Sequence, residues 1–149
     1  MPIYKQGNMF STLNSVDHFI ITTNAIVKRN GALVMGAGIA RQVRDTYPGV
    51  DVECGQAIER AQYPDQQYGL LLNVGGKLGL FQVKRHYKDV ADINLIHYST
   101  QMLYNHATLH PDLTYAMNFP GIGNGKLAYD DVKPWTDSLP NNVQVWTFT

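Results

Sequence analysis

The chain has few of the features that mark a specialised class of protein. It holds one cysteine, Cys54, among 149 residues, so an intrachain disulfide and a cysteine-rich metal site are excluded. No apolar run approaches the roughly 18 residues that a membrane-spanning helix needs, and the N-terminus has no apolar stretch of the kind found in secretory signals. We therefore expect a soluble, cytoplasmic protein.

An excess of charge of either sign is also missing. Lys and Arg together number 12, as do Asp and Glu, so the formal net charge is zero. Dedicated nucleic-acid-binding proteins usually carry a basic excess, so extended binding to a phosphate backbone is not expected, although a local basic patch is compatible with this balance. The chain has no repeat, low-complexity stretch or linker, and we expect one domain over residues 1–149 and a monomer.

Strand-like and helix-like segments alternate along the sequence. The pattern predicts strands at 3–5, 18–23, 68–74, 77–83, 113–118 and 143–148, and helices at 38–47, 50–61, 92–110 and 130–138. Gly75-Gly76 predicts a two-residue hairpin between the third and fourth strands. This order indicates an α/β protein with a mixed sheet covered on both faces, and ligands of such folds bind beyond the carboxyl ends of the strands.

A glycine loop directly follows the strand at 18–23 and leads into the first helix. Gly36 and Gly38 allow a positive φ or a close approach of a ligand. The amino end of the helix directs unpaired amides to the same place, which is a common anion site. The loop lacks the third glycine of the dinucleotide-binding fingerprint. The segment therefore predicts a phosphorylated ligand, and the alternative is a tight strand-to-helix connection.

A second glycine loop, 121–126, follows the strand at 113–118. It fails the Walker pattern, because Pro120 precedes it and Leu127 stands where the metal-binding Ser or Thr belongs. Hydrolysis of nucleoside triphosphates is therefore not expected. Both loops follow strands, so both should line one crevice, where their backbone amides suit a diphosphate.

Lys84-Arg85-His86-Tyr87 ends the strand at 77–83. The cluster is either a solvated basic strand end or places Lys84 in the crevice, where burial or nearby cations such as Arg85 lower its pKa and make it a nucleophile or base. The five histidines show no metal-ligand spacing, and we expect no metal. On the last strand, Trp146 and Phe148 are typical of core residues.

With these residues in view, the whole chain resembles a macro domain, the ADP-ribose-binding fold. It is most similar to the branch that contains the DNA ADP-ribosyl glycohydrolase antitoxins and the terminal ADP-ribose glycohydrolases. That branch has a catalytic lysine in the context where Lys84 stands. The motifs that carry the resemblance are Gly7-Asn8-Met9-Phe10, Thr23-Asn24-Ala25, the loop 35–40 and the loop 118–125.

The resemblance implies a three-layer α/β/α sandwich with a mixed central sheet that binds ADP-ribose or an ADP-ribosylated substrate. It further implies hydrolysis of ADP-ribosyl linkages to DNA, protein or 1″-phosphate without a metal or other cofactor; the alternative is a non-catalytic module that reads or sequesters the ligand. The catalytic residues implied are Lys84 and Asn24. The ligand-binding residues implied are Asn8, Met9, Ala25, Met35, Gly36, Ala37, Gly38, Ile39, Pro120, Gly121, Ile122, Gly123, Asn124, Gly125, Lys126 and Trp146.

The family also suggests roles for three side chains. Asn24 would orient the distal ribose, Asn8 would accept a hydrogen bond from the adenine amino group, and Trp146 would stack on adenine.

The chain departs from the family in several places. Val27 stands where many hydrolytic macro domains have a second Asn, residues 28–33 look like a short insertion, and the second loop looks about two residues shorter. The Asp that assists the lysine in one subgroup has no clear match, with Lys126, Asp130 and Asp131 as candidates. Binding is thus better supported than hydrolysis.

Overall fold

The computed structural model describes residues 1–61 and 63–148 and contains a six-stranded sheet of order β1-β6-β5-β2-β4-β3. Only β3 among these strands runs antiparallel to its neighbour; the other pairings are parallel. The mixed sheet expected from the sequence is therefore confirmed. The strands are β1 (Ile3–Gln6), β2 (His18–Thr23), β3 (Leu70–Val74), β4 (Leu78–Gln82), β5 (Tyr115–Asn118) and β6 (Val143–Thr147).

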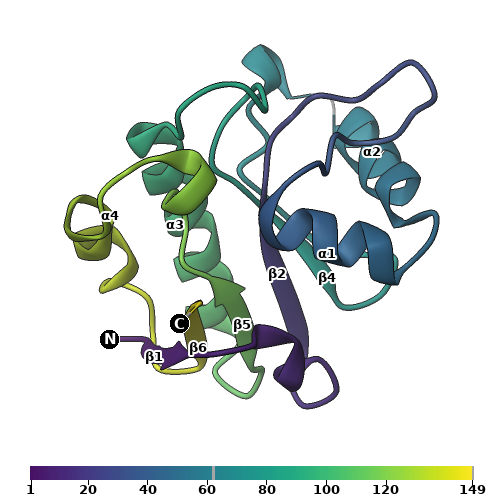
Figure 1. The fold of residues 1–149 in the computed structure, drawn as a ribbon. Helices are drawn as coiled ribbons and strands as arrows, with labels where there is room; N and C mark the ends of the chain where they lie inside the picture. Colours follow the sequence, from purple (N-terminus) through teal and green to yellow (C-terminus); the bar gives the residue numbers. More distant parts are fainter. Residues whose placement is uncertain (62, 149) are drawn as a thin grey trace.

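Helices cover both faces of the sheet, which gives the expected three layers. Figure 1 shows α1 and α2 on one side of the sheet and α3 and α4 on the other. The helices are α1 (Gly38–Thr46), α2 (Val50–Ala61), α3 (Ile93–Leu109) and α4 (Tyr129–Thr136), and three short 3-10 turns are η1 (Met9–Thr12), η2 (Pro64–Gln66) and η3 (Gly123–Gly125). No helix in the described ranges is long and apolar enough to span a bilayer.

The alternation of side chains along β2 explains how one strand contributes to two cores. Phe19 and Ile21 pack into the cluster that includes α1 and α2. Ile20 packs into the opposite cluster with α3 and α4. All three are at most 1% exposed. A strand buried on both faces reads as a continuous apolar run, which is why 18–23 is recognisable in the sequence.

The hairpin between β3 and β4 differs from the two-residue turn expected. Its connection has three residues, 75–77, because β4 begins at Leu78. The Lys77 carbonyl still accepts from the Phe19 amide of β2 at 2.9 Å, and its ammonium donates to the carbonyls of Leu13 and Val16 at 2.7 and 2.9 Å. The ladder also shifts register between Leu71 and Val74, a bulge that the sequence pattern does not reveal.

The carboxyl ends of four strands meet at one edge of the sheet. The pairing of β2 with β4 continues past both strands, since the Val83 amide donates to Thr23 at 3.0 Å and the Ala25 amide to Arg85 at 2.9 Å. Asn24 and Lys84 are consequently brought side by side at that edge. Just beyond β5, the Phe119 amide donates to the carbonyl of Trp146 in β6 at 2.7 Å. Functional side chains from distant parts of the sequence are thus collected in one place.

Candidate functional site

A cleft crosses the carboxyl ends of the strands and consists of two cavities. The first, of about 500 Å³, includes Lys84 and is called here the Lys84 half. The second, of about 540 Å³, includes Trp146 and is called the Trp146 half. Their common wall, called the neck, consists of Gly38, Ile39, Asn118, Ile122 and Asn124. Both glycine loops therefore line one continuous cleft.

The first glycine loop brings the amino end of α1 to the neck. Ala37 precedes the helix and supplies no side-chain cap, so the first amides of α1 remain for a ligand. Gly38 has a φ of +61°, and a Cβ at this position would lie 3.5 Å from Nδ2 of Asn124 on the opposite loop. Gly36 faces open space, because a Cβ added there would have no atom within 4 Å. Close approach of backbone and ligand is therefore possible from this side.

The second glycine loop is anchored on one side and open on the other. A Cβ on Gly121 would lie 2.6 Å from Ile96, and one on Gly125 would lie 2.9 Å from Ala91, so the loop packs tightly against the start of α3. Gly123 has a φ of +66°, and a Cβ added there would have nothing within 4 Å. The glycines thus serve both packing and access to the cleft.

Lys84 lies just beyond β4 and extends into the cleft. Its ammonium donates to the backbone carbonyls of Asp89 at 3.0 Å and Tyr87 at 3.4 Å. Burial lowers the pKa of Lys84; Asp89 opposes this shift, and the positive charge of Lys126 adds to it. The neutral amine is therefore available at a lower pH than for an ordinary exposed lysine.

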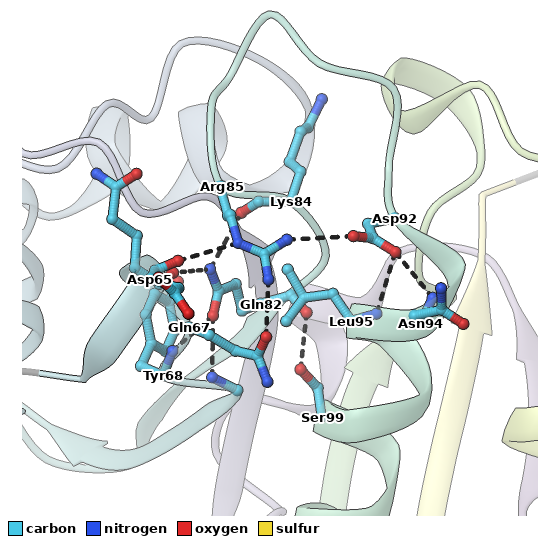
Figure 2. Close-up of polar contacts among 12 residues, drawn as sticks. Asp65, Gln67, Tyr68, Gln82, Lys84, Arg85, Asp92, Asn94, Leu95 and Ser99 are labelled. Atoms are coloured by element: carbon cyan, nitrogen blue, oxygen red, sulfur yellow. Dashed lines mark hydrogen bonds and ion pairs between the residues drawn. The ribbon is translucent and has the colours of Figure 1, made fainter.

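Arg85 has a different role from the one expected. Its guanidinium pairs with Asp92 at 3.1 Å and donates to Gln67 at 2.7 Å and to the Asp65 carbonyl at 3.0 Å. Figure 2 shows Lys84 pointing away from this network. Arg85 is not among the charges that shift the pKa of Lys84. The expectation that Arg85 lowers this pKa is wrong, because its charge is directed to Asp92 while Lys126 faces the cleft.

Gln82 fixes the end of β4 from inside the protein. Its side chain is fully buried, and its Oε1 accepts from the amides of Tyr68 and Gly69 at 2.8 and 2.9 Å. Its Nε2 donates to the Gln66 carbonyl at 2.6 Å (Figure 2). A glutamine within an otherwise apolar strand is a signal of such a role, because buried amides need partners, but sequence reasoning missed it.

Asn24 uses its amide to close the loop between β2 and α1. Its Oδ1 accepts from the Ile26 amide at 2.9 Å, and its Nδ2 donates to the Val34 carbonyl at 2.9 Å. The Tyr68 hydroxyl donates to the Asn24 carbonyl. Asn24 lines the cleft while 8% exposed. One N–H of its amide is left for a ligand.

The Trp146 half combines the start and the end of the chain. Asn8 caps η1, since its Oδ1 accepts from the Phe10 amide at 3.0 Å. The Trp146 indole donates to Gln144 at 3.0 Å, and its ring packs partly against the buried cluster. Phe148 is 75% exposed and also lines the cavity. The expectation that Phe148 is a core residue is therefore wrong, because β6 ends at Thr147 and Phe148 lies just beyond it.

Most residues implied by the resemblance do line the cleft. The exceptions are Ala25 and Pro120, which are both buried behind its wall. Lining residues that sequence reasoning left out of the site include Thr22, Thr23, Gln42, Tyr87, Lys88, Asp89, Asn118, Phe119 and Phe148. Several of these residues lie one to five positions from a predicted residue in the sequence. Extending each motif by a few residues on either side would therefore have included them.

The histidines do not line the cleft, although His86 stacks on the lining residue Tyr87, with ring centroids 4.4 Å apart. None of the five is among its lining residues, and His18, His106 and His110 cluster together, with His18 at the opposite end of β2. Within residues 1–61 and 63–148, no group of three or more His, Cys, Asp or Glu residues is placed to hold a metal ion.

Comparison of the sequence with models of protein families gives no match, and comparison with curated protein sequences gives none. Solved structures do resemble it. Thermosipho africanus DarTG in complex with ADP-ribose aligns with a TM-score of 0.76 and 20% identity over 99% of this chain and 42% of that chain. The macrodomain of Thermus aquaticus DarG aligns with a TM-score of 0.74 and 22% identity, covering 100% of this chain and 98% of that one.

A third structure, the macrodomain of Mycobacterium tuberculosis DarG, has a TM-score of 0.71 and 20% identity over 98% of this chain and 97% of that one. The chain therefore has the macrodomain fold, as its motifs indicate, and its structure resembles DarG macrodomains. This chain spans less than half of the DarTG chain but almost the whole of the two DarG macrodomains.

Proposed function

We propose that the cleft binds ADP-ribose, with adenosine in the Trp146 half, the diphosphate at the neck and the distal ribose in the Lys84 half. The observation that carries the proposal is the neck itself, where the uncapped amino end of α1 faces the second glycine loop. Backbone amides and a helix amino end bind anions without a net positive charge. The likeness to a DarTG structure that holds ADP-ribose supports the same ligand.

The proposed reaction is hydrolysis of the bond between C1″ of the distal ribose and an attached group. Lys84, whose pKa is lowered by burial, attacks or polarises C1″. Water supplies the oxygen that ends on C1″, and the attached group leaves with a proton. The amides at the neck hold the diphosphate and so orient the substrate. Attached groups consistent with this proposal are a nucleobase of DNA, a protein side chain or terminus, and a phosphate.

A non-catalytic ADP-ribose-binding module is the second candidate, and two contacts favour it. The Lys84 ammonium is held by the carbonyls of Tyr87 and Asp89, which stabilise its charged form. The Asn24 amide is largely engaged with Ile26 and Val34. Both contacts reduce the groups available for chemistry while they leave the binding cleft intact.

Product analysis separates these two candidates. The purified protein is incubated with ADP-ribosylated DNA, ADP-ribosylated protein and ADP-ribose 1″-phosphate, and released ADP-ribose or phosphate is quantified. We expect release from at least one substrate and a loss of at least about a hundredfold in Lys84→Ala, the usual contribution of a positioned acid or base. ADP-ribose affinity should be mostly retained. Lys5→Ala, on the edge strand β1 outside the cleft, is the matched control.

The pH profile gives a second readout of the same experiment. The pKa of Lys84 lies below that of an ordinary lysine. Attack by the neutral amine predicts a rate that rises with pH through this pKa, whereas polarisation of C1″ by the charged ammonium predicts a rate that falls through it. If neither ADP-ribose nor phosphate is released from any of the three substrates, the proposed hydrolase activity is refuted and the non-catalytic binding module is supported. Full activity in Lys84→Ala would preserve the enzyme and refute the role of Lys84.

A further inference from the structure

Charged side chains are distributed unevenly along the cleft. Three lysines, Lys84, Lys88 and Lys126, line the Lys84 half together with one acid, Asp89. The described residues that line the Trp146 half include no charged side chain. The chain as a whole balances 12 basic against 12 acidic residues. The positive character of the Lys84 half is therefore local and does not follow from composition.

The lysines are not placed where the diphosphate is proposed to bind. The neck carries the glycine loops and the amino end of α1, which serve that anion through backbone amides. Lys84, Lys88 and Lys126 belong to the Lys84 half and are absent from the neck. Lys84 has a proposed role in chemistry, whereas Lys88 and Lys126 are left without one. Two further positive charges beside the distal ribose suit another negative group beyond it.

Lys126 is held at this place by an unusual backbone conformation. Its φ is +64°, at the end of η3, and its amide donates to the Gly123 carbonyl at 2.9 Å. Glycine or asparagine adopts this region more readily than lysine. The Lys126 side chain lines the cleft, and its charge is felt by Lys84, whose pKa it helps to lower. A cation is thus positioned across from the proposed reacting amine.

We propose that Lys126, assisted by Lys88, selects ADP-ribosyl substrates whose attached group carries a phosphate next to the linkage. This inference rests on the proposed function, because it assumes that the distal ribose occupies the Lys84 half. A phosphate in this position would receive charge-assisted hydrogen bonds from flexible ammonium groups. ADP-ribose itself has no charge there, so the lysines discriminate between substrates more than they add affinity for the shared part.

Calorimetry with two ligands tests the inference. ADP-ribose 1″-phosphate serves as the simplest probe that carries a phosphate at the linkage, and ADP-ribose is the reference. Titrations are run at low temperature, and anion-exchange chromatography afterwards confirms that the probe is intact. We expect the wild type to bind the phosphate-bearing probe at least about tenfold more tightly, and the difference to shrink as salt is raised.

The variants are chosen to remove charge without disturbing the loop. Lys126→Asn keeps a residue that tolerates positive φ and should reduce the ratio of the two affinities to less than about threefold, while ADP-ribose affinity changes by less than about twofold. Lys126→Arg should keep the ratio. Lys5→Asn removes one charge on β1, at a residue that does not line the cleft, and should also keep the ratio. Lys88→Asn, on a separate loop, gives an independent partial reduction if Lys126→Asn folds poorly.

The outcomes separate this inference from the function on which it rests. Equal affinity of the wild type for the two ligands, with normal ADP-ribose binding, refutes the phosphate selection alone. An unchanged ratio in well-folded Lys126→Asn and Lys88→Asn refutes the role of these lysines. If ADP-ribose does not bind at all, the proposed function fails, and the inference fails with it.

Discussion

The two halves of the cleft are built from the same sheet edge but differ in chemistry. The Trp146 half is neutral and aromatic, and beyond the neck most of its lining residues lie near the chain ends, around η1 and β6. The Lys84 half follows the central strands β2 and β4 and contains three lysines. A neutral aromatic surface suits the flat face of a base, whereas a cationic and partly buried cavity suits reactivity and anions. The comparison suggests that recognition and chemistry are assigned to different parts of one cleft.

The supporting contacts differ in the same way. Lys84 follows a strand end that is fixed from within by the buried Gln82 amide and by the Arg85–Asp92 pair (Figure 2). Trp146 is supported by partial packing and one hydrogen bond to Gln144, and Phe148 beside it is mostly exposed. Changes in the Trp146 half should therefore alter affinity with little effect on turnover. The following variants test that division.

The largest effect is expected in the first glycine loop, which leads into the neck and lines the Lys84 half next to it. Gly36→Glu places a carboxylate beside the diphosphate, and we expect ADP-ribose binding to fall by more than about a hundredfold in calorimetry. Gly36 suits this test better than Gly38 or Gly123, whose positive φ values would strain any substitution. Gly36 has no such value and faces open space, so the variant should stay folded.

Gly36→Gln is the matched control, because it has nearly the same bulk without the charge. It should bind more tightly than Gly36→Glu. Tight binding by a folded Gly36→Glu protein would place the ligand elsewhere on the molecule.

An intermediate effect is expected for Trp146→Ala. Loss of a base-stacking aromatic costs about 1–3 kcal/mol, so ADP-ribose affinity should fall about tenfold, with a proportional loss for other adenine-containing ligands. Turnover at saturating substrate should stay unchanged, since Lys84 lies in the other half. If the variant keeps its affinity for ADP-ribose but has a lower melting temperature, Trp146 has a purely structural role.

The smallest effect is expected for Asn8→Ala. A neutral hydrogen bond to adenine is worth about 1 kcal/mol, so affinity for ADP-ribose should fall about fivefold. Because Asn8 also caps η1 through its Oδ1, thermal unfolding must be measured alongside. Asn8→Asp is the informative partner, since it keeps the cap and should bind adenine ligands at least as well as the wild type. Equal losses in both variants would exclude adenine recognition at this position.

Much of the fold could be predicted because its signals are local. The apolar run of β2 and the position of Asp92 before α3, which it caps through its side chain, mark elements without reference to the rest of the chain. Both glycine loops are visible for the same reason. Lys77 shows the limit, because its ammonium contacts the carbonyls of Leu13 and Val16 in a distant segment, which the local sequence pattern around β4 does not indicate.

The sequence predicts which motifs line the site, but it does not predict which side chains contact one another there. The sequence places Lys84 and Arg85 together, yet the fold sends Arg85 to Asp92 and brings Lys126 to the cleft. The double engagement of Asn24 likewise depends on the path of the loop that returns to Val34. Such contacts form only when the strand ends assemble at one edge of the sheet. The spacing of the residues in the sequence therefore does not predict them.

The most direct test of the divided cleft is calorimetry of the wild-type protein with ADP-ribose and with adenosine. Binding across both halves and the neck predicts a micromolar dissociation constant for ADP-ribose, about −8 kcal/mol, and much weaker binding of adenosine, which lacks the diphosphate and the distal ribose. Equal affinity for the two ligands would contradict the claim that the neck holds a diphosphate.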